Sequence, residues 1–221
     1  HGVTVYFWDE SRNNWATWSD SRPVTQPGFD AAGRFRSDGP WDGCRSPQEA
    51  AESVLRLTQA SRNPHGRLSG RSATRALLVG PSQPREAPCA VASWTDLADR
   101  AQRFFGAGLG ERNENQDLVL LTPKSWGPPF YDTLRQELIR PVADDAGRVV
   151  NLWLPFTSEN EAGVEFLERL DSAAAFGLLG AIRLVAGQVR IQPISLYVED
   201  RTVHLTLLEP KANASTKKSP K

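Results

Sequence analysis

The chain has 221 residues, and its 26 basic and 26 acidic side chains give a formal net charge of zero. Its 39% hydrophobic and 24% charged residues are typical of a soluble globular protein. A neutral chain has no overall field that attracts nucleic acid or a membrane, so any such attraction needs a local excess of charge. No apolar run approaches the ~20 residues that span a bilayer. We therefore expect no membrane contact and a cytoplasmic location. The two cysteines, Cys44 and Cys89, are too few for a disulfide framework.

The first elements are expected to be a β-hairpin and then a helix. Residues 3–8 alternate with a period of two, and the turn-forming segment ESRNN separates them from a second short strand. Residues 21–47 are rich in Pro, Gly, Asp and Ser and indicate irregular chain. The sequence Ser-Pro-Gln-Glu at 46–49 is typical of a helix start, and we expect that helix to continue to residue 62.

A basic stretch follows, and it is the most distinctive local feature. Residues 53–85 contain six arginines and one histidine but no Asp or Glu. Arginine forks bind phosphate in a bidentate manner, so this stretch is a candidate surface for nucleic acid or another polyanion. Acids elsewhere in the neutral chain are the alternative partners for this charge. The candidate binding residues are Arg56, Arg62, His65, Arg67, Arg71 and Arg75.

After this stretch, strand and helix patterns alternate. Strands are expected at 75–80, 117–123 and 147–156, helices at 93–105, 128–142 and 158–177, and β-structure over 181–208. This order predicts an α/β fold, with α+β as the alternative: a mixed sheet with flanking helices, an N-terminal β-hairpin and C-terminal antiparallel strands. We expect one domain over 1–210, comprising a hairpin and irregular part at 1–45 and a helix-flanked sheet at 46–210, followed by a flexible basic tail at 211–221.

A possible ligand site lies at the expected carboxyl ends of two strands. Lys124 follows one strand and is the only lysine before residue 211. Ser158 and Glu159 follow the next strand, where Ser158 is expected to cap a helix. Ligands of open α/β sheets bind at this edge, and helix-start N–H groups suit phosphate. These three residues are therefore candidates for binding a phosphorylated or nucleotide ligand.

Catalytic motifs are missing. The chain has no Gly-x-Ser-x-Gly, no phosphate-binding Gly-Lys-Ser/Thr loop and no His-Glu-x-x-His. We therefore assign no catalytic residue, expect no cofactor and no metal, and leave open whether the protein is an enzyme. His1-Gly2 resembles the amino terminus of secreted copper mono-oxygenases that cleave polysaccharides, but those enzymes are β-sandwiches and this chain is expected to contain four helices.

Tryptophans near the N-terminus add to the interpretation of the basic stretch. Trp8, Trp15, Trp18 and Trp41 lie close together in sequence, and aromatic rings stack on unpaired bases. The first hypothesis is a non-catalytic binding subunit, part of a larger assembly, that engages nucleic acid or an acidic protein partner through the arginine-rich loop. The second is an enzyme that acts on a phosphorylated or nucleotide ligand near Lys124.

Overall fold

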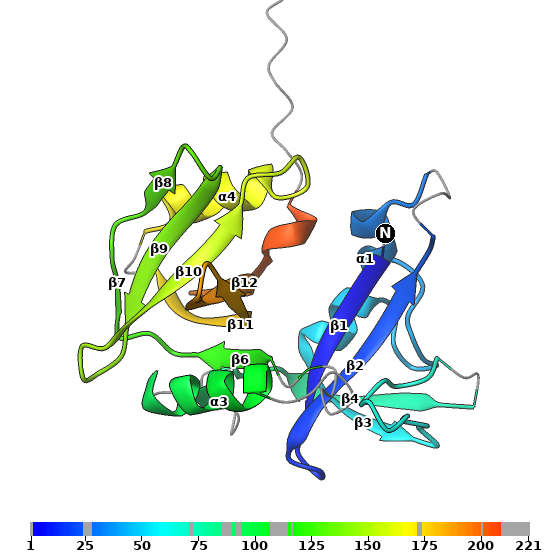
Figure 1. Ribbon diagram of the computed structural model, residues 1–221. Helices are drawn as coiled ribbons and strands as arrows, with labels where there is room; N and C mark the ends of the chain where they lie inside the picture. The colour runs from blue at the N-terminus through cyan, green and yellow to red at the C-terminus, as the bar shows by residue number, and fades with distance from the viewer. Residues whose placement is uncertain are drawn as a thin grey trace, which may run out of the picture.

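The computed structural model describes residues 2–23, 28–70, 73–84, 90–91, 94–106, 115, 117–171, 174–199 and 201–208. The described part is mostly β-structure with few helices, and its largest sheet is mixed. Its buried hydrophobic residues form two clusters, one in the N-terminal elements and one in the elements that follow β4. Figure 1 shows the elements that carry the two clusters as a blue-to-cyan group and a green-to-orange group.

The N-terminal group consists of two hairpins and two short helices. Its elements are β1 (Gly2–Asp9), β2 (Asn14–Ser21), α1 (Ala31–Arg36), α2 (Pro47–Ala51), β3 (Ser53–Thr58) and β4 (Arg75–Pro81). β1 pairs antiparallel with β2, as the sequence predicts, and β3 pairs antiparallel with β4. The two hairpins and α2 surround the first cluster, in which Val5, Trp18 and Trp41 are buried.

The helix expected over residues 46–62 is much shorter. Its start is confirmed, because the Ser46 side chain accepts a hydrogen bond from the backbone N–H of Glu49 and Pro47 opens the helix. The helix ends at Ala51, and β3 begins two residues later. The sequence SVLRLT alternates between half-buried and exposed positions, so period two and pairing with β4 outweigh the helical pattern there.

The C-terminal group forms a closed barrel with two longer helices. Its elements are β5 (Ala90–Val91), α3 (Trp94–Gly106), β6 (Leu118–Leu121), β7 (Ser125–Trp126), β8 (Phe130–Asp132), β9 (Glu137–Ala143), β10 (Val149–Pro155), α4 (Glu161–Arg169), β11 (Ala175–Val185), β12 (Gln188–Val198), β13 (Arg201–His204) and the 3-10 helix η2 (Leu205–Leu207).

Strand pairing closes the barrel. β9 pairs antiparallel with β10, β10 pairs parallel with β12, and β12 pairs antiparallel with β11. The stretch 118–132 supplies both closing edges, because β6 pairs with β11 while β7 and β8 pair with β9. If this stretch counts as one strand, the order around the barrel is 1-2-3-5-4-1, and α4 connects the third strand to the fourth.

Apolar side chains line the barrel interior, together with an arginine that fixes α4. Leu138, Val142 and Leu152 are among the buried residues of the second cluster. Arg140 faces the same side of β9 and is buried, and its Nη1 donates hydrogen bonds to the carbonyl oxygens of Leu167 (2.6 Å) and Leu170 (3.0 Å). Burial lowers the pKa of Arg140. The guanidinium thus satisfies carbonyl groups at the C-terminal end of α4.

Several sequence predictions for this group are confirmed and two need correction. α3, β6 and β10 lie where a helix and two strands are expected. The helix expected over 128–142 is instead β8 and β9. Leu138 and Val142 fit both a helical and an alternating pattern, and pairing of β9 with β10 decides for the strand.

The other correction concerns the helix expected over 158–177. α4 spans only Glu161–Arg169, and its N-cap is Asn160 rather than Ser158, without a side-chain capping bond. The residues from Ala175 onward pair as β11. The predicted mixed sheet and C-terminal antiparallel strands are present, but strand dominates over helix more than expected.

The two groups touch near the end of the described chain. Leu207 of η2 packs against the N-terminal cluster, and the Phe35 ring lies edge-on to His204 at 4.8 Å between centroids. Burial lowers the pKa of His204, whose Nδ1 shares a 2.9 Å hydrogen bond with Ser195 Oγ. The organisation of residues 1–210 as one domain remains a prediction.

Candidate functional site

Part of the charge in the arginine-rich stretch is compensated inside the protein. Arg62 Nη1 lies 2.8 Å from Asp9 Oδ2, and its Nη2 donates to the carbonyl oxygen of Trp15 at 2.7 Å. Only 9% of the Arg62 side chain is exposed. Arg62 therefore joins the loop to the β1–β2 hairpin and is not free to bind a polyanion.

The other arginines of this stretch are more accessible. Arg56 is exposed on β3, and Arg75 forms an exposed 3.6 Å ion pair with Asp42. Arg67 is exposed and donates to the carbonyl oxygen of Ser19. His65 is also exposed in the same loop. Arg71 lies outside the described residues, as does His1, so the structure does not test either.

The three residues predicted at the sheet edge do not come together. The backbone N–H of Lys124 bonds to Ala143 at one end of β9, whereas Phe156, two residues before Ser158, bonds to Gln136 at the other end. Seven residues of strand at ~3.4 Å each separate these ends by roughly 24 Å. Lys124 is exposed beside Asp145 at 4.0 Å, and Ser158 and Glu159 are exposed in a turn. No common ligand site arises from them.

An aromatic surface lies on the outer face of the barrel. Because Leu138 and Leu152 face the core, their neighbours Ile139 and Trp153 face outward, and these two are paired in the β9–β10 ladder. Phe130 of β8 pairs with Ile139 from the other side. Phe130 is 61% exposed, and Ile139 and Trp153 are half-buried. We call Phe130, Ile139 and Trp153 the outer row; it crosses three adjacent strands.

A buried ion pair supports the outer row. Glu137 of β9 and Arg190 of β12 lie on either side of β10, and Arg190 Nη1 is 2.7 Å from Glu137 Oε1. Each residue is 4% exposed. The Trp153 indole donates its Nε1 hydrogen to the other carboxylate oxygen of Glu137. This bond fixes the plane of the indole on the barrel surface.

The ionisation of Glu137 reflects two opposing effects. Burial alone would raise the pKa of its carboxyl group, but hydrogen bonds from Arg190 and Trp153 and the charge of Arg190 outweigh burial and hold the pKa below its ordinary value. Glu137 is therefore an anion at neutral pH.

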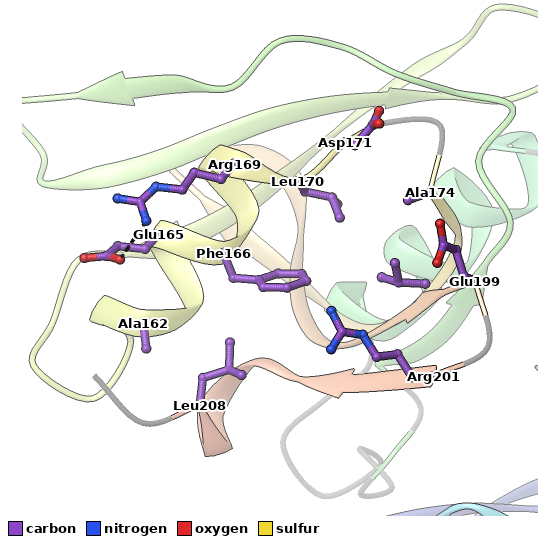
Figure 2. Close-up of a pocket in the computed structure, with 11 residues that line it drawn as sticks. Ala162, Glu165, Phe166, Arg169, Leu170, Asp171, Ala174, Glu199, Arg201 and Leu208 are labelled. Atoms are coloured by element: carbon purple, nitrogen blue, oxygen red, sulfur yellow. Dashed lines mark ion pairs between the residues drawn. The ribbon is translucent and has the colours of Figure 1, made fainter. Parts of the chain in front are cut away.

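A cavity of about 630 Å³ lies beside α4 (Figure 2). Its apolar lining includes Phe166, Leu170 and Leu208, and Figure 2 shows Arg201 and Glu199 on the side opposite α4. Arg169 of α4 is paired with Glu165 at 3.5 Å. Both signs of charge are present, so the lining does not favour a ligand of one charge.

The described residues do not indicate a metal site or a membrane span. No three His, Cys, Asp or Glu side chains among them gather closely enough to hold a metal ion. Within the same part of the chain, no helix combines the length and hydropathy needed to cross a bilayer.

Sequence reasoning missed Phe130, Trp153, Glu137 and Arg190. The helix predicted over 128–142 conceals the alternation that places Phe130 and Ile139 on one surface. The alternation of 149–155 contained the signal for Trp153, since it lies between Leu152 and Leu154, which are both buried. Nothing in the sequence indicates that Glu137 and Arg190 meet across β10.

The comparisons with known proteins agree with the strand order. Residues 115–221 are similar to the family described as the YehQ C-terminal OB-fold domain. The matched range includes all five barrel strands and α4, and OB-folds are five-stranded Greek-key barrels. No curated protein and no solved structure matches the chain.

Proposed function

We propose that this protein is a non-catalytic binding subunit that holds single-stranded nucleic acid across the outer row of its barrel. OB-folds bind oligonucleotides and oligosaccharides on the face of their second and third strands, which here are β9 and β10. The observation that carries the proposal is the outer row itself, because it presents two aromatic rings on that face. Aromatic rings on such a face suit the stacking of unpaired bases.

The geometry of the outer row suits stacking for two reasons. The Phe130 ring is largely open to solvent, so a base can reach it without a change of fold. The indole of Trp153 is held by Glu137, so binding costs little side-chain entropy there. Arg135 precedes β9 in the β8–β9 turn. Its Nη1 lies 4.0 Å from Glu137 Oε1, but its side chain is 56% exposed, so it can still contact a backbone phosphate. In this proposal, the exposed Arg56 of β3 and Arg67 of the following loop add long-range attraction.

Phe130→Ala tests the outer row with little risk to the fold. We expect the variant to bind a labelled single-stranded oligonucleotide about 5- to 150-fold more weakly by fluorescence anisotropy, since stacking contributes ~1–3 kcal/mol per base. The matched control is Leu77→Ala, because Leu77 is 59% exposed against 61% for Phe130 but lies on β4. Equal affinities for Phe130→Ala and the unaltered chain would refute the proposal.

An acidic protein partner is the second candidate, and one observation favours it. The outward face of the β3–β4 hairpin carries Arg56, Arg75 and three exposed aliphatic side chains but no acid. Those aliphatic residues are Val54, Leu77 and Val79.

A soluble peptide of alternating Glu and Val tests this candidate by calorimetry. We expect binding that Arg56→Glu abolishes and that Arg135→Glu leaves unchanged. No heat of binding to the unaltered chain, or equal effects of the two reversals, would count against this candidate.

A further inference from the structure

A second pocket lies between the N-terminal hairpin and the barrel. It has a volume of about 240 Å³ and is formed by the β1–β2 turn, loop residues 62–66, α3 and the start of β6. It therefore unites part of the arginine-rich stretch with the N-terminal tryptophans. Its lining includes Trp8, Trp15, Arg62, His65, Arg100 and Asn115.

Two indoles supply the aromatic part of this pocket. Trp8 and Trp15 are directly opposite in the β1–β2 ladder, with ring centroids 5.4 Å apart and planes at 77°. An edge-to-face pair leaves one ring face without an aromatic neighbour. Both residues are half-buried, so a planar ligand that stacks on them is also shielded from water.

The charge of the pocket favours an anion. None of the lining residues that the structure describes is acidic. Asp9 lies behind Arg62 and is already paired with it, so Arg62 forms a wall of the pocket and its charge is compensated. Arg100 of α3 is half-buried, and the structure gives it no acidic partner among the described residues. His65 adds a further donor at the exposed rim.

The polar groups and the size restrict the ligand further. Trp8 Nε1 and Asn115 Nδ2 are buried donors without an acceptor in the described part of the chain. The side chains of Asn13 and Asn14 offer the paired donor and acceptor that recognise a base edge. Cavities for drug-sized ligands measure ~300–1,000 Å³, so this smaller pocket suits a single base with its phosphate at the rim.

A glycine keeps the loop close to the hairpin. Gly66 has φ +89°, and a Cβ there would lie 3.1 Å from both Arg62 Nη2 and the carbonyl oxygen of Trp15. The carbonyl oxygen of Gly66 also accepts a 3.0 Å hydrogen bond from the backbone N–H of Thr17. The pocket wall is thus built by backbone contacts and exists before a ligand binds.

We infer that this pocket binds one nucleotide unit, with the unpaired base against Trp8 and Trp15 and the phosphate at Arg100. The ligand is either a free nucleoside monophosphate or the phosphorylated end of a single strand, which have the same chemistry. This inference goes beyond the proposed function because it uses no residue of the outer row.

Calorimetry with adenosine monophosphate, adenosine and inorganic phosphate tests the inference on the full chain. We expect the monophosphate to bind and the other two to bind at least 10-fold more weakly, since base and phosphate are both required. A 5′-phosphorylated oligonucleotide that competes with the monophosphate would identify strand ends as a source, and absence of competition would identify the free nucleotide. No binding of the monophosphate at millimolar concentration overturns the inference.

Substitutions locate the site. Arg100→Gln should weaken monophosphate binding about 10- to 100-fold, the effect of losing charge-assisted hydrogen bonds. Arg103→Gln is the matched control on α3, because Arg103 is exposed and bonds to a backbone oxygen of its own helix. Asn14→Asp, an isosteric change at an exposed position, should also weaken binding by adding a negative charge.

The failures of the two proposals are distinguishable. Phe130→Ala should reduce the affinity for an oligonucleotide that lacks a terminal phosphate and leave the affinity for the monophosphate unchanged. Arg100→Gln should reduce the affinity for the monophosphate and leave the affinity for that oligonucleotide unchanged. If Arg100→Gln and Arg103→Gln bind the monophosphate equally well, the pocket is not the site.

Discussion

Removal of the Glu137 carboxylate should destabilise the barrel strongly. Glu137→Leu leaves Arg190, which is 4% exposed, without its anion, and Arg190 Nε already has no hydrogen-bond partner among the described residues. Breaking one side of a buried ion pair costs about 3–5 kcal/mol. The same substitution deprives Trp153 of its acceptor. A loss of about 4 kcal/mol is a large share of the ~5–15 kcal/mol that stabilises a typical domain.

Urea denaturation at pH 7, followed by tryptophan fluorescence, measures this loss. With a slope of about 2 kcal/mol/M, a 4 kcal/mol loss lowers the midpoint by roughly 2 M. The double variant Glu137→Leu with Arg190→Met removes both charges, and we expect it to recover most of the stability or exceed that of the unaltered chain. If Glu137→Leu lowers the free energy of unfolding by less than about 1 kcal/mol, the interpretation is refuted that Arg190 is buried with Glu137 as its counter-ion.

The pH dependence of the unaltered chain gives an independent check. Because the folded pKa of Glu137 is lowered, its stabilising contribution is complete above its unfolded value of ~4.3 and is lost as pH falls through the folded pKa. The double variant should lack this contribution, so the stability difference between it and the unaltered chain should change in the variant's favour below pH 4.3. A difference that does not change with pH would contradict the assignment.

Three further predictions concern positions outside the outer row. Because the pKa of His204 is lowered in the folded state, the free energy of unfolding should fall as pH drops below ~6.5, by at most ~1.4 kcal/mol per pH unit. His204→Phe should reduce this slope in urea titrations, and an unchanged slope would exclude His204 as its cause. Ser46→Ala should cost ~1 kcal/mol through loss of the helix cap, measured as the change in urea midpoint, whereas Ser46→Asp should not. Arg140→Met should lower the free energy of unfolding by about 1–3 kcal/mol and increase amide exchange in α4, because the carbonyl groups of Leu167 and Leu170 lose their donor. Unchanged exchange would contradict the role of Arg140 in holding α4.

The sequence predicts elements best where only one periodicity fits. Residues 2–21 alternate around a turn and form the expected hairpin, and the helical pattern that begins near residue 93 forms α3. Over 128–142, however, apolar residues four apart fit both a helix and a strand. Pairing with β10, which lies further along the chain, resolves this ambiguity, and local sequence contains no information about it.

The candidate site was less predictable than the fold for a similar reason. An excess of arginine over acid in residues 53–85 is visible in the sequence, but Asp9 compensates Arg62 across 53 residues. Likewise, the Glu137–Arg190 pair spans 53 residues and crosses an intervening strand. Such long-range pairs follow from the three-dimensional arrangement of strands, so composition identifies charged residues without showing which remain free.

We propose that single-stranded nucleic acid lies across the outer row. Ultraviolet cross-linking of a single-stranded oligonucleotide to the full chain, with identification of the modified peptides by mass spectrometry, tests it most directly. We predict cross-links at Phe130 and Trp153 that an excess of unlabelled strand abolishes. Cross-links confined to peptides outside residues 124–156, or none under conditions where the strand binds, would contradict the account.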